Sequence, residues 1–531
     1  MGRTAVDDVA WCEMSAARSM KNGESDGDTM LVFDDAPQKP NKPKDMQRDT
    51  ATYFEPEYLA QKPKKQKGNH REIVPVVDPC TDLANANRFV ATHGRNLRYV
   101  ATWSKWVAWS GERWTVDSAG AHIQAAKATT SEIFDEASAL YKTGDNDNAK
   151  ARFKWAVKSQ NAKQIGAMIQ LARTDPRVVT DHTQFDADQW LLNVRNGTVD
   201  LRTGKLQQHR REDLIAKLCP VVYDPGEACP VWNGFISDIM GGNAELIAYL
   251  QRLIGYALTG SIREHVLGFF FGGGSNGKTT FLGAIRHVLG SYAGHATRGI
   301  LFPHKNEHPT ELTDLCGRRF VTCAEVEEHD AFDEARLKDL TGGEPIKGHR
   351  MREDFWEFRP THKLFLAGNH KPNVRGTDDG IWRRIRLIPF MVTIADGKKD
   401  KDLPAKLEAE AAGILAWAVR GCVEWQRIGL GDPMAVREAT AEYRKDSDLL
   451  GDFCSSRLTF DPSGRLEKST LTGLLKAWAE DLGIKVPGSK IVAARMRVLG
   501  AKESTARNAL GKVKDCWQGV REAAGVASEA A

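Results

Sequence analysis

A glycine-rich segment near the middle of the chain constrains the fold more than any other feature. Residues 272–279 read Gly-Gly-Gly-Ser-Asn-Gly-Lys-Thr; they follow an apolar run and precede apolar residues at helical spacing. This is the G-x-x-x-x-G-K-T pattern of a phosphate-binding loop, in the strand–turn–helix setting that the pattern requires. Glycines let backbone N–H groups turn inward around a polyphosphate, and the helix N-terminus favours negative charge. The sequence therefore predicts an α/β domain that binds ATP or a related nucleotide.

The loop and the first helical residues supply the expected contacts to the nucleotide. These contacts are Gly272, Gly273, Gly274, Ser275, Asn276, Gly277, Lys278, Thr279 and Thr280. Lys278 is expected to hold the β- and γ-phosphates, and the Thr279 hydroxyl is expected to hold Mg²⁺.

A second strand-like run, residues 318–324, leads into three acids. A phosphate-binding loop needs a carboxylate at the end of a neighbouring strand, to order Mg²⁺ and to activate water. Glu325 and Glu327 are the predicted pair for metal and water, and the pattern does not divide the two roles between them. A solvated strand end that happens to be acidic is the alternative interpretation.

The next segment predicts a hairpin with a cationic tip. A Gly-Gly turn at 342–343 is followed by Lys347, His349 and Arg350, and then by an aromatic strand over 355–358. On an ATPase, such a tip is a candidate for gripping a nucleic-acid backbone. A solvated basic loop is the alternative.

Two further elements complete the predicted site. The apolar strand 363–368 ends on Asn369, whose amide could polarise the attacking water or sense the γ-phosphate. Arg383 and Arg384 then precede another apolar strand over 385–390. Guanidinium donors fork over two oxygens and so match the charge that spreads over a transferring phosphoryl group.

The order of these elements resembles superfamily 3 helicases. More closely, it resembles the phage and plasmid primase-helicase family that includes the poxvirus replication helicase. The phrases that carry the resemblance are Leu-Thr-Gly-Gly-Glu at 340–344, Gly-Asn-His-Lys-Pro at 368–372 and Gly-Thr-Asp-Asp-Gly-Ile-Trp-Arg-Arg at 376–384. The resemblance extends over about four fifths of the chain.

The resemblance implies a replicative DNA helicase: a hexameric ring with an AAA-type core that uses ATP and Mg²⁺ to move 3′-to-5′ on single-stranded DNA. It makes Asn369 the sensor, makes Arg383 or Arg384 the arginine finger, and puts Lys347, His349 and Arg350 in the DNA-contacting hairpin. Single-stranded and forked DNA and other replication proteins are then the expected partners, during replication of a phage, prophage or plasmid.

Composition excludes several other classes of protein. The 531 residues carry a net charge of +4 and 41% hydrophobic residues, which is ordinary for a globular protein. The nine cysteines show no zinc spacing and are expected to be reduced, mostly core thiols. We find no apolar run that could span a bilayer and no signal peptide, so we expect no membrane partner and a location in the cytoplasm of a bacterial host cell.

The predicted organisation has four segments. A disordered tail covers 1–72, a mixed α+β helicase-associated domain covers 73–255, the α/β ATPase core covers 256–430, and a winged-helix-like DNA-binding domain covers 445–531. Within them we expect a hairpin between residues 98 and 117, helices from 127 to 173, and an Asn-Gly turn between short strands near 196. Residues 404–425 are expected to form one long amphipathic helix.

Two alternatives to the helicase remain open. One is a primase-helicase, although residues before the core show no zinc spacing or paired-carboxylate strand, so we expect no priming. The other is a replication initiator in which ATP drives ring assembly with little unwinding.

Overall fold

The computed structural model describes residues 79–303, 310–328, 330–348, 356–374, 379–482, 486–507 and 512–523. The predicted tail (1–72), two predicted hairpin residues (His349 and Arg350) and residues 375–378 lie outside the described residues. The chain divides into two compact units. The helical unit comprises the described part of Met1–Thr92 together with Ile123–Ala172, and the main unit comprises His93–His122 together with the described residues from Arg173 onward.

The described residues of the helical unit form four helices. They are α2 (Asp82–His93), α3 (Ala121–Lys142, of which the first two residues belong to the main unit), α4 (Asn146–Ser159) and α5 (Ala162–Ala172). Buried polar side chains hold them together: the Asn85 amide donates to Ser159 Oγ at 2.9 Å and accepts from Trp155 Nε1 at 3.0 Å. Arg88 forms two hydrogen bonds with the Glu136 carboxylate. The predicted helical region is confirmed.

Two small sheets open the main unit. The first has the order β3-β2-β1-β4, formed by β1 (Leu97–Val100), β2 (Lys105–Trp109), β3 (Trp114–Val116) and β4 (Val179–Thr180). The second is antiparallel, formed by β5 (Leu191–Val194), β6 (Gly197–Asp200) and β7 (Lys205–Gln207). The predicted hairpin between 98 and 117 and the Asn196-Gly197 turn are both present.

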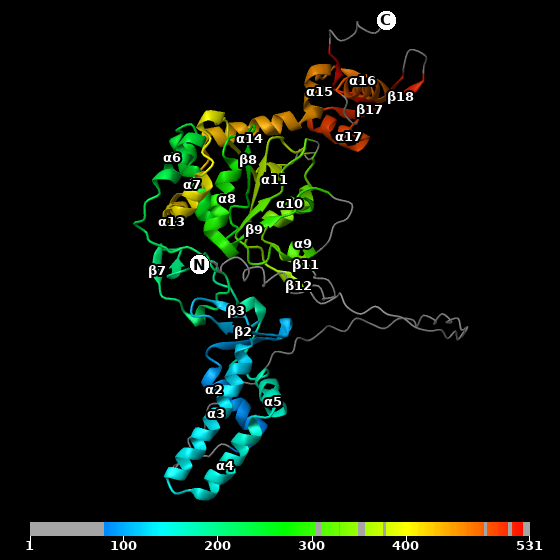
Figure 1. Ribbon diagram of the computed structural model, residues 1–531. Coiled ribbons are helices and arrows are strands. Elements are labelled where there is room, and N and C mark those ends of the chain that lie inside the picture. Colours follow the sequence, from blue (N-terminus) through cyan, green and yellow to red (C-terminus); the bar gives the residue numbers. More distant parts are fainter. Residues whose placement is uncertain are drawn as a thin grey trace, which may run out of the picture. The chain divides into compact units, whose positions relative to one another are not determined.

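A five-stranded sheet forms the centre of the main unit (Figure 1). Its strands, all parallel, are β14 (Ile385–Pro389), β8 (Leu267–Phe271), β13 (Lys363–Gly368), β10 (Phe320–Cys323) and β9 (Ala293–Ala296), in that spatial order. A two-stranded antiparallel hairpin of β11 (Ile346–Gly348) and β12 (Trp356–Phe358) lies between β10 and β13 in the sequence. The mixed α/β fold class is confirmed.

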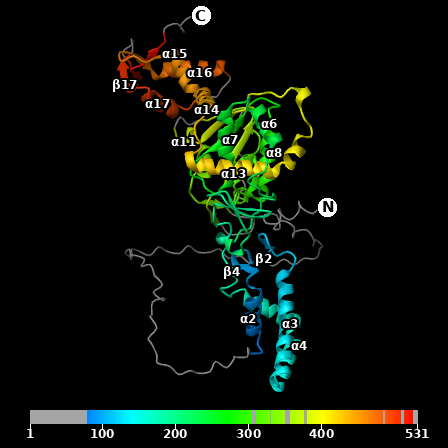
Figure 2. The ribbon, with the colours of Figure 1, turned by 90° about the vertical axis from the view of Figure 1, so that its left-hand side faces the viewer.

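Helices cover both faces of this sheet, as Figures 1 and 2 show. In chain order the helices described in this part of the chain are α6 (Pro230–Ile239), α7 (Ala244–Leu258), α8 (Lys278–Leu289), α9 (Thr310–Thr313), α10 (Glu334–Thr341), α11 (Asp379–Trp382), α12 (Leu403–Ala409), α13 (Ala411–Ile428) and α14 (Met434–Ser447). Side chains alternate across each strand. Phe270 of β8 therefore packs in one core with α7, α8 and α13, whereas Leu267 and Phe269 pack in a second core with α10 and α14.

The expected single helix over 404–425 is wrong. The structure has two helices, α12 and α13, that meet at Glu410. The Glu410 carboxylate accepts hydrogen bonds from the backbone N–H groups of Val231 and Trp232, at 2.9 and 2.8 Å, at the start of α6. This carboxylate thus satisfies two free donors at the N-terminus of another helix. The amphipathic pattern of 404–425 contains no sign of that long-range contact.

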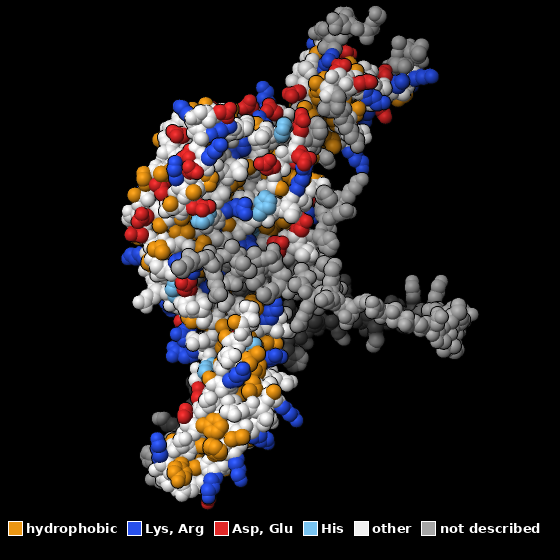
Figure 3. Space-filling model, in the orientation of Figure 1, with side chains coloured by type: hydrophobic (Ala, Val, Ile, Leu, Met, Phe, Trp, Pro, Cys, Tyr) orange, Lys and Arg blue, Asp and Glu red, His pale blue; other side chains and the backbone are white. Residues whose placement is uncertain are grey.

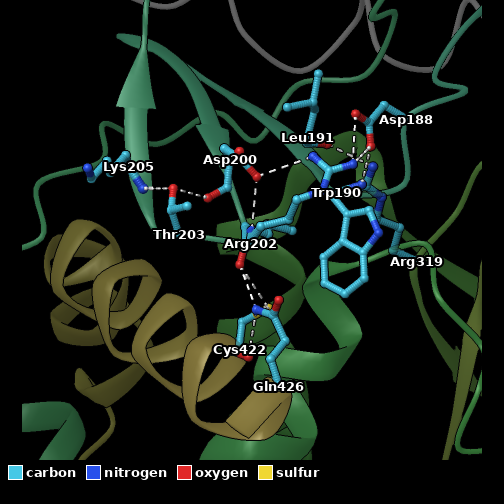
Figure 4. Close-up of polar contacts among 11 residues, drawn as sticks. Asp188, Trp190, Leu191, Asp200, Arg202, Thr203, Lys205, Arg319, Cys422 and Gln426 are labelled. Atoms are coloured by element: carbon cyan, nitrogen blue, oxygen red, sulfur yellow. Dashed lines mark hydrogen bonds and ion pairs between the residues drawn. The ribbon is translucent and has the colours of Figure 1, made fainter.

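A polar joint ties the small sheets to the central sheet (Figure 4). Arg319, which directly precedes β10, is buried and donates to the carbonyl oxygens of Leu258 and Leu191 at 2.7 and 2.8 Å. Gln426 of α13 donates to Leu201 O at 2.8 Å. Arg202 forms an ion pair with Asp188 at 3.0 Å. Segment 188–202 is therefore held by Arg319, by α13 and by its own ion pair.

The C-terminal part of the main unit has its own core, around Phe453, Leu475, Trp478 and Trp517. Its elements are α15 (Leu449–Arg457), β15 (Leu458–Thr459), β16 (Arg465–Glu467), α16 (Lys468–Asp481), α17 (Ser489–Val498), β17 (Lys502–Arg507), β18 (Val513–Gln518) and β19 (Arg521–Glu522). β18 pairs antiparallel with both β16 and β17. The four predicted segment boundaries themselves stay predictions.

Two expectations from composition can be compared with the structure. Every cysteine within the described ranges is a free thiol, and burial raises the pKa of the Cys219, Cys323 and Cys422 thiols to about 12. None of the helices in the described part of the chain combines the length and the apolar character needed to cross a membrane.

The crossing of α7 and α13 gives a prediction about stability. A Cβ added at Gly255 would lie 2.1 Å from the Cys422 nitrogen, whereas a Cβ at Gly283 of α8 meets nothing within 4 Å. We expect Gly255→Ala to force the helices apart and to cost about 1–3 kcal/mol or more. Gly283→Ala should be neutral or stabilising by up to about 1 kcal/mol, because alanine is the better helix former. Thermal unfolding of the two variants checks this, and equal melting temperatures would contradict it.

Candidate functional site

The phosphate-binding loop connects β8 to α8. Two residues in it have a left-handed backbone, Ser275 with φ of 59° and Gly277 with φ of 81°. A Cβ at Gly277 would lie 2.6 Å from Ile239, and one at Gly272 would lie 2.1 Å from the Phe390 carbonyl oxygen. Glycine is therefore required at both ends of the loop by its surroundings. At Gly273 and Gly274, in contrast, nothing of the chain lies within 4 Å of an added Cβ, so this backbone is open to a ligand.

Lys278 is the centre of the site. Its ammonium donates to the Gly272 and Gly273 carbonyl oxygens, at 2.7 and 3.1 Å, and to Asn276 Oδ1 at 2.9 Å. It also donates to Asn369 Oδ1 at 3.0 Å, although the two residues are 91 positions apart. Burial lowers the pKa of this ammonium, and the nearby Glu325 carboxylate partly offsets the effect. Lys278 and Asn369 are therefore in direct contact, and Glu325 is close enough to affect the pKa of the ammonium.

Sheet order explains this meeting. The carboxyl ends of parallel strands lie at one edge, and β13 lies between β8 and β10. Asn369 follows β13 directly and thus stands next to the loop that follows β8. Glu325 is two residues past β10, one strand further away, and its side chain is exposed. Thr279, whose side chain is exposed, is the second residue of α8.

Asn276 fixes the loop to the rest of the sheet. It is 3% exposed, and its amide nitrogen donates to the Gly273 carbonyl oxygen at 2.5 Å and to the Phe390 carbonyl oxygen at 3.0 Å. Phe390 in turn donates its N–H to the Phe271 carbonyl oxygen at the end of β8. The side chain that accepts from Lys278 is thus itself held in place by two backbone groups.

The two predicted acids have different surroundings. Glu327 forms an ion pair with Arg298, which follows β9 and also binds Asp330. The Glu327 N–H donates to Asp330 Oδ2 at 2.8 Å, and Asp330 is buried. Arg298 and Asp330 were not predicted from the sequence. No local pattern marks them, since their pairing depends on β9 lying beside β10.

The two predicted arginines also differ. Arg384 donates from Nε to Thr341 Oγ1 at 3.1 Å and from a terminal nitrogen to the Gly380 carbonyl oxygen at 2.6 Å. Arg383 is exposed, and its side chain has no hydrogen-bond or ion-pair partner among the described residues. Both precede β14, whose first residue Ile385 pairs with Leu267, the first residue of β8. They therefore lie at the amino edge of the sheet, away from their own loop.

The structure describes the base of the predicted cationic hairpin. Lys347 of β11 pairs in register with Glu357 of β12, and both side chains are exposed, with a distance of 3.9 Å from Nζ to Oε1. In the part of the chain that the structure describes, no group of three His, Cys, Asp or Glu side chains could hold a metal ion by itself.

Two family models match this chain. The model described as D5 N terminal like matches residues 86–241, and a family of unknown function, DUF5906, matches residues 270–384. The second range contains the loop, both acids, Asn369 and both arginines.

Curated viral proteins are similar to parts of the chain. A candidate helicase of Acanthamoeba polyphaga mimivirus, L207/L206, is 24% identical over 348 residues, which are 59% of this chain and 36% of that protein. A candidate helicase of Frog virus 3, 022R, is 25% identical over 48% of this chain and 29% of that protein. A candidate primase of African swine fever virus, C962R, is 24% identical over 38% of this chain and 22% of that protein. This chain thus spans between about a fifth and a little over a third of the length of these relatives.

Among solved structures, the A form of the apo NrS-1 C-terminal region is 10% identical and covers 80% of this chain and 96% of its own, with a TM-score of 0.45.

Proposed function

We propose that this chain, which belongs to the primase-helicase family of phages and viruses, is a DNA helicase driven by ATP hydrolysis. One observation carries the proposal: the Lys278 ammonium, the Asn369 amide and the Glu325 carboxylate are neighbours at the carboxyl edge of a parallel sheet, beside an open glycine loop. The strand order, with the sensor strand between the loop strand and the acidic strand, supports an AAA-type core.

The roles follow from chemistry. Lys278 would exchange its carbonyl partners for the β- and γ-phosphate oxygens, whose charge would favour its protonated form. Glu325 would take a proton from, or orient, the attacking water, and the Asn369 amide would direct that water or the γ-phosphate. Phosphate oxygens would accept from the backbone N–H groups of the loop.

The oxygen ligands that are present fit a magnesium ion. Thr279 and Glu325 are exposed at the same edge, and Mg²⁺ is usually held by one or two protein oxygens together with substrate phosphates and waters. When bound, it would neutralise charge on the transferring phosphoryl group.

The arginines support action between subunits. A strand of five residues at about 3.3 Å per residue puts roughly 16 Å between Arg383 and the edge that carries its own loop. Arg383 would then act on a neighbouring subunit's ATP, in a homo-hexameric ring, while Arg384 holds the segment in place through Thr341.

DNA contacts would come from two places. The β11–β12 hairpin carries exposed Lys347, and the other two predicted contacts, His349 and Arg350, lie outside the described residues. The order α15, β16, α16, α17, β17, β18 suits a winged-helix module. In it Lys490 of α17 is exposed, Arg497 is paired with Glu503, and Arg495 is paired with Asp448. We therefore assign Arg495 a structural role.

Priming is the second candidate function, because one of the similar viral proteins is named as a primase. Incorporation of labelled ribonucleotides on a single-stranded template separates a primase-helicase from a helicase. An initiator would instead bind one duplex sequence and unwind little.

The first prediction from this function concerns Lys278. We expect Lys278→Ala to reduce ATP hydrolysis and the unwinding of forked DNA to background, because the loop then lacks its own cation for the β- and γ-phosphates. The variant also loses the hydrogen bonds of the ammonium to the loop and to Asn369, so circular dichroism, which should match that of the wild type, is measured to show that the fold is kept. Lys398→Ala, at an exposed position in the same unit, is the matched control. Wild-type turnover in Lys278→Ala would sink the proposed function.

The second prediction separates the acids. Glu325→Gln should lower kcat for ATP about a hundredfold or more with little change in KM, as expected for loss of a general base. Glu327→Gln should lower kcat less than about tenfold, because Glu327 faces Arg298, and Glu328→Gln, an exposed neighbour, should have no effect. Steady-state ATPase assays measure all three. Equal losses at positions 325 and 327 would refute the division of roles.

The third prediction separates the arginines. Arg383→Ala should be inactive alone with an unchanged melting temperature, whereas Arg384→Ala should melt earlier because it loses contacts to Thr341 and Gly380. Mixed with Lys278→Ala, Arg383→Ala should regain part of its ATPase, since some interfaces then combine an intact loop with an intact arginine. An arginine finger contributes about a thousandfold or more, so partial rescue is measurable. Co-assembly without rescue would count against a shared site.

A further inference from the structure

One face of α4 in the helical unit combines exposed lysines with exposed apolar side chains. Lys150, Lys154 and Lys158 recur every four residues, so they follow one side of the helix at a rise of about 6 Å per step. Between them on the same face stand Phe153 and Val157, which are 56% and 51% exposed. Figure 3 shows hydrophobic side chains interspersed with Lys or Arg side chains on this unit.

The packing of α4 against the rest of the unit leaves large apolar side chains on this face exposed. α4 already buries Trp155 and Ala156 in the core of the unit, and Phe153 only touches Phe134 of α3 edge-on, with ring centroids 5.4 Å apart. At the end of α3, Tyr141 is 71% exposed. Large apolar side chains that remain in water on such a small unit indicate a surface that binds something.

The lysine charges on this face distinguish between its possible binding partners. A second copy of this face would bring two rows of lysines together, and like charges oppose that pairing. The acids nearby do not cancel the row. Asp147 lies at the start of the helix, and Glu136 of α3 is already bound by Arg88 and Arg152. Regularly spaced cations beside an exposed aromatic ring match a polyanion that also presents flat apolar faces.

We propose that the α4 face of the helical unit is a binding site for single-stranded DNA. Lys150, Lys154 and Lys158 contact successive backbone phosphates, and Phe153 stacks on a base. Lys158 also stays within 5.2 Å of the Trp155 ring, which holds its side chain along the helix. All residues of this site belong to the helical unit, whereas the β11–β12 hairpin belongs to the main unit. The proposal rests on the proposed function only in the choice of DNA as ligand.

The test uses the full chain and fluorescent oligo(dT), without ATP, over a series of salt concentrations. A triple variant, Lys150→Ala/Lys154→Ala/Lys158→Ala, should keep its helices, because alanine favours helix at exposed positions. Its slope of log affinity against log salt should fall by about 2, since each phosphate contact on a single strand contributes about 0.7. Phe153→Ala should weaken binding about tenfold with the slope unchanged, as loss of one stacked base predicts.

The matched control removes three exposed lysines elsewhere, Lys205→Ala/Lys398→Ala/Lys401→Ala, and should keep the wild-type slope. An equal change in both triple variants would show a non-specific charge effect and overturn the proposal. An unchanged slope in the α4 variant would also overturn it, in favour of an acidic protein partner. Basal ATPase should be normal in both variants. Failure of this site thus differs from failure of the proposed function, which loss of the Lys278→Ala effect would reveal.

Discussion

The backbone pairing of β8 between β13 and β14 is the constraint on which the candidate site depends. Because β13 runs parallel to β8 in register from Leu267 to Phe271, the chain leaves both strands at the same edge. That pairing brings Asn369 within 3.0 Å of Lys278. Pairing of β14 on the other side brings the Phe390 carbonyl oxygen to Asn276. The loop is thus held by strands on both sides, which gives it a fixed shape before any ligand binds.

The opposite edge of the sheet is fixed by buried cations. Lys363, the first residue of β13, is buried and donates to the carbonyl oxygens of Thr259, Ser261 and Thr361. Burial lowers the pKa of this ammonium, and the nearby Arg319 guanidinium lowers it further. Buried cations are tolerated when oxygen atoms surround them. Here these oxygens belong to the residues that follow α7 and to a residue that precedes β13. These hydrogen bonds fix the amino edge of the central sheet. Because the strands are short, that edge also helps to position the groups at their carboxyl ends.

The loop, the acids and the asparagine can be proposed as one site from the sequence because their signals are local. A glycine loop between a strand and a helix, an acid after a strand and an asparagine after a strand each show in a few consecutive residues. The α/β fold followed from the same alternation of strands and helices.

What could not be predicted depends on partners distant in the sequence. Nothing near Glu327 indicates that Arg298 binds it, so the two acids looked equivalent. Arg384 differs from Arg383 only through Thr341 and Gly380, which the fold brings to it. Glu410 lies where the expected amphipathic helix is interrupted, and its carboxylate accepts hydrogen bonds from the start of α6. Similarly, the exposed row on α4 is visible only when the buried side of that helix is known.

The amino edge also connects the two proposed working parts of the motor. Thr341 ends α10, shortly before β11 begins the hairpin, and its hydroxyl accepts from Arg384 while donating to Leu337. Its carbonyl oxygen also contacts His265 Nδ1 at 2.8 Å, just before β8. We therefore expect a shift of the end of α10 to act on Arg384, the residue next to Arg383, and on the segment that leads into β8. Under the proposed function, DNA bound at the hairpin and ATP hydrolysis in a neighbouring subunit would both act through the Thr341 side chain. This link requires no long chain of intermediates, since a single buried threonine touches the arginine segment and lies at the base of the hairpin.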